Sequence, residues 1–212
     1  FDEGKPVAAG FDSPTYAAWN AFRESDDARY VSLTLPQTLA RLPYGEKGLS
    51  TDSFSYEELG TDAEGNPLPK DNGQLVWSNA AFELGLKMSQ SHTAFGWCTA
   101  IRGLENGGKV ENLPNLTYLS DAGDIQQQCP IEVNLTDERE KELSDLGFLP
   151  LVHYKNTNFG VFIGGQTTQK PKVFVDPDAT GNAAISARLP YIMASSRIAH
   201  YLKVMGRDML GS

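Results

Sequence analysis

The last quarter of the chain has the clearest pattern of apolar and polar positions. Apolar residues recur there at steps of three and four, at Tyr191, Ala194, Ile198, Leu202, Met205 and Met209. This spacing predicts one α-helix with a single apolar stripe. Gly211 suits a helix C-terminus. A helix of this length must bury its stripe on a partner, and the chain stops at Ser212, so we expect a fragment of a larger protein.

Three further helices follow from local signals. Ser13 and Pro14 resemble an N-cap followed by proline at the first helical position, and they open a short helix ending near Ser25–Asp27. A second helix is predicted from Gln74 to Phe95 and ends at Gly96. Its expected apolar side consists of Leu75, Ala81, Phe82, Leu86, Met88 and Phe95. A charged helix spans Glu138 to Leu146, capped by Thr136 or Asp137.

Segments rich in β-forming residues predict the strands. Tyr30–Leu35 is stopped by Pro36, and Trp97–Arg102 and Ile131–Leu135 are expected to be strands as well. The chain also contains Phe148–Tyr154 and Phe159–Gly165, a predicted pair of strands around the turn at Lys155–Asn158. Helices and strands mix without regular βαβ alternation, so the fold class is α+β, with a mixed sheet flanked by helices.

Residues 44–73 interrupt this organisation. The segment is rich in Gly, Pro, Asp, Ser and Asn and has little periodicity, so we expect a mobile loop. Residues 74–212 are then predicted to form the main core. Five apolar residues at strands and helix ends should be buried in it: Trp97, Ile101, Leu146, Phe148 and Val152.

Charge and composition narrow the class of protein. The chain has 18 Lys and Arg against 27 Asp and Glu, giving a net charge of −9. An acidic balance argues against nonspecific nucleic-acid binding, which requires a basic face for phosphates. No signal peptide is visible and no window approaches the length of a membrane span, so membrane insertion is not expected. Two cysteines, Cys98 and Cys129, suggest reduced thiols in a cytoplasmic protein.

Catalytic, cofactor and metal signatures are weak. The glycines of Gly103–Gly108 lack the Lys that a phosphate loop needs, and we interpret them as a turn. The three histidines are too scattered for a zinc site. The enzyme alternative is a cysteine-dependent hydrolase using Cys98 with His153 or His200. The aromatic neighbours of Cys98 instead favour a buried neutral thiol. We predict no catalytic residues, no cofactor and no metal.

A third hypothesis is a carbohydrate- or peptide-binding module that uses Trp19, Trp77 and Trp97. Tryptophan rings bury large areas, so core and interface positions are expected more often than an exposed binding platform. Exposure of all three rings on one face would support the binding module. The residues alone therefore favour a structural or interaction protein.

Short segments spread over the chain resemble, in order, the large subunit of the type VI secretion contractile sheath. They are Trp19–Ser25, Tyr30–Pro36, Ala40–Gly45, Trp77–Ala81, Gly96–Gly103, Gly107–Pro114, Cys129–Glu132, Thr136–Leu143, Leu146–Val152, Gln169–Lys172, Leu189–Tyr191, His200–Lys203 and Arg207–Asp208. The resemblance implies a structural protein without catalytic residues and a core like that of contractile phage-tail sheaths. The 44–73 segment matches no fixed pattern of the family.

The resemblance also implies partners and a mechanism. A sheath large subunit assembles with a small sheath subunit and with copies of itself around an inner tube. It contracts to propel the tube, and an AAA+ unfoldase later recycles it. A helix of the large subunit is expected to contact the tube, and Arg197, Lys203 and Arg207 are the candidate contacts. The alternative is that these cations pair within the chain, with the acidic helix at Glu138–Glu142.

Overall fold

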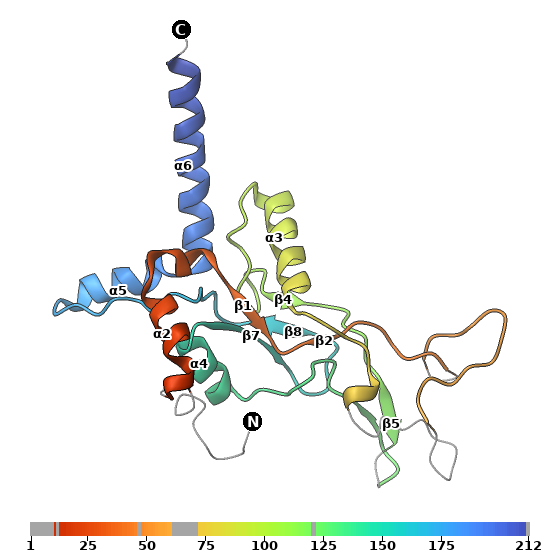
Figure 1. Cartoon of the computed structure of the whole chain (residues 1–212). Coiled ribbons are helices and arrows are strands. Elements are labelled where there is room, and N and C mark those ends of the chain that lie inside the picture. Colours follow the sequence, from red (N-terminus) through yellow and green to blue (C-terminus); the bar gives the residue numbers. More distant parts are fainter. Residues whose placement is uncertain (1–10, 12, 46–47, 61–71, 120–121, 211–212) are drawn as a thin grey trace.

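A mixed four-stranded sheet lies at the centre of the molecule, with helices on its two faces (Figure 1). The computed structural model describes residues 11, 13–45, 48–60, 72–119 and 122–210. The strands lie in the order β1 (Leu33–Leu35), β7 (Phe148–His153), β8 (Gly160–Phe162) and β4 (Lys109–Val110). β1 runs parallel to β7, and the other neighbours are antiparallel. The predicted α+β class is confirmed.

The β7–β8 hairpin supplies the interior of the sheet. At the end of β7, the ring N–H at Nε2 of His153 donates to the carbonyl oxygen of Thr157 in the connection, with the two atoms 2.8 Å apart. Successive side chains of β7 point to opposite faces, as strand geometry requires. Leu149 and Leu151 pack into the main cluster, whereas Val152 belongs to a second cluster on the other side. The predicted strand pair is confirmed.

Helix α4 (Asp137–Asp145) covers one face of the sheet. Its cap is Thr136, whose hydroxyl accepts a hydrogen bond from the Arg139 amide at 3.3 Å. Leu143 packs beside Val152 of β7. The sequence prediction of this helix and of its cap is therefore correct.

Helix α3 (Ala81–Phe95) contributes to the main cluster through Leu84. It ends at Gly96, which has φ 71°, a left-handed conformation that favours glycine. The predicted start at Gln74 is wrong, because Asn72–Gln74 form a 3-10 turn (η3) and Trp77–Ser78 form strand β3.

Strand β3 pairs with β2 (Thr38–Leu39), and the Asn79 side chain then caps α3 by accepting from the Ala81 amide at 2.8 Å. The apolar side predicted for α3 is also wrong in part. Phe82, Leu86 and Phe95 are exposed.

Two predicted strands are absent from the described residues, although both segments supply core side chains. Residues 97–102 form bends and loop, and 131–135 form only a bridge from Ile131 to Thr38. Of the five residues expected to be buried, Ile101 and Val152 are buried, Leu146 and Phe148 are half-buried, and Trp97 is 42% exposed. The Trp97 prediction is wrong, although Ile101 of the same segment is buried in the core.

The remaining elements surround this centre. They are η1 (Pro14–Tyr16), α2 (Ala17–Glu24), η2 (Asp26–Tyr30), the hairpin β5 (Thr117–Leu119) with β6 (Ile125–Gln127), α5 (Pro177–Ser186) and α6 (Leu189–Met209). Within 44–73, residues 46–47 and 61–71 lie outside the described part, so mobility of the whole segment stays a prediction. Its described part has an anchor in the Arg41–Glu58 ion pair, with N and O atoms 2.7 Å apart.

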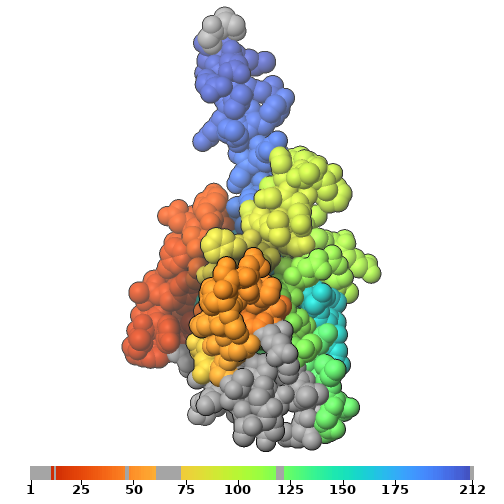
Figure 2. Space-filling view, turned by 90° about the vertical axis from the view of Figure 1, so that its right-hand side faces the viewer, coloured from red at the N-terminus to blue at the C-terminus, as the bar shows by residue number. Residues whose placement is uncertain are grey.

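The last helix, α6, forms an arm (Figure 1). Helix α6 rises from the top of the body and ends far from the sheet, and the space-filling view, turned by 90°, shows the same projection (Figures 1 and 2). Only Leu189 and Ile192 of its 21 residues are buried, and α5 has no buried residue.

Candidate partner-binding surface

Helix α6 is attached to the body at its first turn. The Leu189 amide donates to the Gly165 carbonyl at 2.7 Å, and Pro190 occupies the first turn, where a missing N–H costs little. Leu189 packs into the main cluster, with Met193 beside it. The base of the helix is thus fixed by the core.

The apolar stripe of α6 lies on the side opposite this attachment. Leu189 and Ile198 are separated by nine residues, or about two and a half turns, which places them on opposite sides of the helix. The stripe residues Tyr191, Ile198, Leu202, Met205 and Met209 are all more than a third exposed. Among the described residues the chain itself leaves this stripe uncovered, because the core takes the other side of the helix. Burial of the stripe on a partner stays a prediction.

Two basic residues of α6, Lys203 and Arg207, lie on the side of the helix that carries Leu189, further along its axis. Arg207 lies five turns above Leu189 on the same side, and Lys203 is one turn below Arg207. Arg197 lies about 80–120° around the axis from these two. All three side chains are exposed. The cations predicted to act together therefore occupy a broad face, with Lys203 and Arg207 as its centre.

The ion pair of Arg207 is local. The Arg207 Nε atom lies 3.1 Å from an oxygen of its neighbour Asp208, and both side chains are mostly exposed. In the described residues, no ion pair joins Arg197, Lys203 or Arg207 to α4, where Arg139 pairs with Glu142 at 2.8 Å. Pairing of the three cations with the acidic helix is therefore not observed among the described residues.

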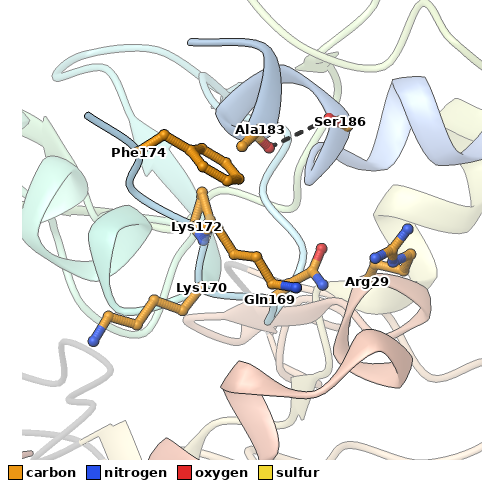
Figure 3. A pocket seen from close by; sticks show the side chains of 8 residues that line it. Arg29, Gln169, Lys170, Lys172, Phe174, Ala183 and Ser186 are labelled. Carbon is orange, nitrogen blue, oxygen red and sulfur yellow. Dashed lines mark hydrogen bonds between the residues drawn. The ribbon is translucent and has the colours of Figure 1, made fainter. Parts of the chain in front are cut away.

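A small pocket lies between the body and α5, where the Phe174 ring faces the strand-like segment after Gln169 (Figure 3). Its volume is about 120 Å³, well below the size of most small-molecule sites. Arg29 already pairs with Asp26 at 2.8 Å. Lys170 extends away from Phe174 and Arg29 and lies 4.0 Å from Glu24. With Arg29 already paired and Lys170 directed away, this small pocket is a weak candidate for an anion site.

The cysteine–histidine alternative receives no support from the geometry. Cys98 is half-buried in the loop after α3, His153 is engaged by Thr157, and His200 lies on the exposed part of α6. In the part of the chain that the structure describes, no hydrogen bond joins Cys98 to either histidine. Burial raises the pKa of the Cys129 thiol, which disfavours a thiolate there.

The described residues contain neither a candidate metal site nor a candidate membrane-spanning helix. Across the described ranges, no three His, Cys, Asp or Glu side chains gather closely enough to hold a metal ion. No helix in these ranges combines the length and apolar character needed to cross a bilayer.

The three tryptophans do not share an exposed face. Trp19 is half-buried and stacks on Phe148, with ring centroids 5.6 Å apart. Trp77 packs against the small cluster around Leu39. Of the three, only Trp97 is exposed, at 42%, so the tryptophans do not form the shared exposed face that a binding module would need.

Comparison with known proteins accounts for nearly the whole chain. Residues 1–169 match the family model described as EvpB/VC_A0108, tail sheath N-terminal domain, and residues 178–212 match the tail sheath gpW/gp25-like domain of the same family. The chain is 46% identical over 202 residues to the type VI secretion system sheath protein TssC1 of Pseudomonas aeruginosa PAO1. The match covers 95% of this chain and 39% of the relative's length. The chain belongs to the EvpB/VC_A0108 tail sheath family, the large-subunit family of the type VI secretion sheath.

Proposed function

We propose that the full-length protein is a structural subunit of a contractile type VI secretion sheath and has no catalytic role. The observation that carries this proposal is the pair of sheath-family matches, which together cover almost all of the chain. The 46% identity to a sheath protein supports it. We also assign the sheet and its helices to a phage-tail-sheath-like core.

The assembly follows from this role. The subunit pairs with a small sheath subunit and with its own copies in the cytoplasm, and the polymer surrounds an inner tube. Contraction moves the lattice to a more compact state, and an AAA+ unfoldase takes the contracted polymer apart. The core, with three buried clusters, suits a rigid body, so the conformational change belongs to interfaces and linkers.

The α6 cations are the proposed contact with the inner tube. Arg197, Lys203 and Arg207 are exposed on a projecting helix of a chain whose net charge is −9. Cations at such a position favour encounter with an acidic strip on a partner and penalise partners of like charge. Their exposure also means that they contribute little to the stability of the chain itself.

The test is charge reversal at all three positions, Arg197→Glu, Lys203→Glu and Arg207→Glu. In the 212-residue chain the melting temperature should change by less than about 3 °C, since exposed pairs are weak. In the full-length protein, made with its small subunit, assembly on the tube should fall at least about tenfold. Sedimentation and electron microscopy of the polymer give the second readout.

A matched control reverses three exposed lysines elsewhere, Lys141→Glu, Lys155→Glu and Lys172→Glu, which changes the net charge equally. Normal assembly of this control, with loss in the α6 variant, supports the tube contact. Unchanged assembly of the α6 variant contradicts it. Unfolding of the 212-residue chain by the α6 variant would assign these cations to intrachain pairs instead.

A further inference from the structure

A second pocket lies beside the one drawn in Figure 3 and shares Gln169 and Pro171 with it. It is formed by the last turns of α2 and α4, the segment that follows β8, and the junction of α5 with α6. Its volume is about 160 Å³. Since one water molecule takes up about 30 Å³ of the liquid, the pocket has room for one small polar group and is too small for a cofactor or a nucleotide.

Arg23 brings a buried positive charge to this pocket. Only 5% of the residue is exposed. Its Nε and Nη2 atoms donate to the carbonyl oxygens of Thr168 and Asp145, and among the described residues no hydrogen bond involves Nη1. A guanidinium has five N–H donors and stays charged in proteins. Two bonds to neutral carbonyls therefore leave Arg23 with donors in excess and with a charge that a bound anion could balance.

Arg188 is the second cation of the pocket. It lies opposite Gln166 in an isolated antiparallel bridge, and residues opposite one another in such a pair project to the same face. Arg188 is half-buried, and within the described ranges its guanidinium takes part in no ion pair. The Oε1 atom of Gln166 accepts from the Gly165 amide at 2.8 Å, so the side-chain –NH2 group of Gln166 remains as a donor.

One acidic residue, Asp145, also lines the pocket and limits the charge that a ligand can carry. Asp145 is exposed, and in the described part of the chain it forms no ion pair with Arg23 or Arg188. Two guanidinium groups against one carboxylate leave a single positive charge. A singly charged anion balances this charge, whereas a phosphate group carries about 1.5 to 2 negative charges at pH 7 and exceeds it.

We propose that this pocket binds a single carboxylate group, held by the guanidinium groups of Arg23 and Arg188 and by the side-chain amide of Gln166. Arginine and carboxylate match in geometry, because the planar fork donates two parallel hydrogen bonds to the two oxygens. A carboxylate here connects α2 and the segment after β8 to the base of α6. The proposal does not depend on the sheath assignment and can fail without it.

The test is a titration of the 212-residue chain with acetate, exchanged for chloride at constant ionic strength and followed by amide NMR spectra. Acetate should shift the amide signals of Gln166, Thr167 and Arg188 in a saturable way. A Kd of about 1–10 mM suits a ligand with so few atoms. Arg188→Gln should raise this Kd at least about tenfold, because the fork is lost.

Arg29→Gln is the matched control, since it removes one cation from the adjoining pocket and changes the net charge equally. It should change the Kd for acetate less than about twofold. Asp145→Asn should act in the opposite direction and lower the Kd at least about threefold, because a like charge leaves the pocket. A gain in affinity cannot arise from a loss of folding, and circular dichroism shows whether Arg188→Gln is still folded.

A second probe distinguishes the two sources of a carboxylate, a free small molecule and an acidic side chain of a polypeptide. It is N-acetylglutamate α-amide, with N-acetylglutamine α-amide as its uncharged control. Binding at least about threefold tighter than that of acetate would assign a glutamate side chain as the ligand, and equal or weaker binding would assign a free carboxylate.

Three results would each overturn the proposal. They are shifts that stay linear in acetate concentration, an unchanged Kd in a folded Arg188→Gln variant, and weaker acetate binding by Asp145→Asn. Inorganic phosphate serves as the last probe. Phosphate binding tighter than acetate binding would contradict the charge balance that selects a carboxylate.

Discussion

The central sheet and helix α6 are both rich in apolar residues, yet they use them in opposite ways. Strand β7 has four consecutive buried residues, and both of its faces are covered, one by the main cluster with α3 and one by α4. Helix α6 buries only two residues near its base, and its apolar stripe is exposed. One region completes its core within the described chain, and the other does not.

Because of this difference, we expect substitutions in the sheet to lower the stability of the chain and substitutions on α6 to affect assembly. Residues that stabilise the 212-residue chain should lie in the sheet and its covering helices, where burial removes apolar area from water. Substitutions on α6 beyond its base should leave this chain folded and act only when other parts of the protein or its partners are present. A comparison of single substitutions in the two regions measures this separation directly.

The largest effect is expected for Phe162→Ala in β8. Phe162 is 0% exposed and lies in the main cluster. Removing a fully buried aromatic ring costs its transfer free energy and leaves a cavity, typically about 3–5 kcal/mol of unfolding free energy. Urea denaturation of the 212-residue chain, followed by circular dichroism, measures the loss.

Tyr201→Ala on α6 is the matched change in the other region. Tyr201 is 63% exposed, so its removal should lower the unfolding free energy by less than about 0.5 kcal/mol. A loss comparable to that of Phe162→Ala would mean that the arm packs on the body in solution. The contrast between the two regions would then fail.

An intermediate effect is expected for Arg23→Met. The buried guanidinium of Arg23 donates to the carbonyl oxygens of Thr168 at 3.0 Å and Asp145 at 2.8 Å, which joins α2 to the end of α4 and to the loop after β8. Burial lowers the pKa of Arg23, and the nearby Asp145 charge opposes that shift. Methionine keeps the apolar stem but leaves both carbonyls without this donor, at a cost of about 2–3 kcal/mol.

Arg23→Lys serves as the control for charge. Lysine retains a cation but cannot place two donors in the fixed fork that reaches both carbonyls. Its unfolding free energy, again from urea denaturation, should lie between those of Arg23→Met and the parent chain. An unchanged unfolding free energy for Arg23→Met would show that hydrogen bonds to water replace those of Arg23 at no cost in stability. Arg23 would then not hold the three segments together.

Local signals in the sequence were sufficient for several elements. The caps at Thr136 and Gly96 and the β7–β8 hairpin were predictable because neighbouring residues determine them. Helix α5 has a comparable local signal, an Asp176 cap followed by Pro177. The start of α3 was misplaced because β3 forms only by pairing with β2, at a distance of almost forty residues along the chain.

Features that depend on the tertiary fold were not predictable in this way. The role of Arg23 requires carbonyl groups more than a hundred residues away, and its own helix pattern gives no indication of them. The α6 stripe was predicted correctly as a helical pattern, but periodicity identifies an apolar side without identifying its partner. The candidate cations were found by their contrast with an acidic chain, and their placement opposite the stripe follows only from knowing which side of α6 meets the core.

A small, pH-dependent effect is expected for Glu58→Gln, in the described part of the 44–73 segment. Both carboxylate oxygens of Glu58 accept from the Arg41 guanidinium, at 2.7 and 2.9 Å, and one also accepts from the Tyr44 amide at 2.9 Å. These hydrogen bonds lower the pKa of Glu58 to about 2. Glutamine removes the charge, and the melting temperature at pH 7 should fall by no more than a few degrees, since the pair is partly exposed.

The depressed pKa of Glu58 also predicts how its contribution to the melting temperature changes with pH. A carboxylate whose pKa is depressed by folding adds stability above its unfolded pKa, near 4.3, and that contribution disappears as the pH falls toward 2. The melting temperatures of the parent chain and Glu58→Gln should therefore converge as the pH falls from about 5 to about 2. Glu111→Gln, which removes the more exposed partner of Lys109, should show a smaller difference throughout. Parallel curves for the parent and Glu58→Gln would mean that Arg41 does not hold this segment to the body in solution.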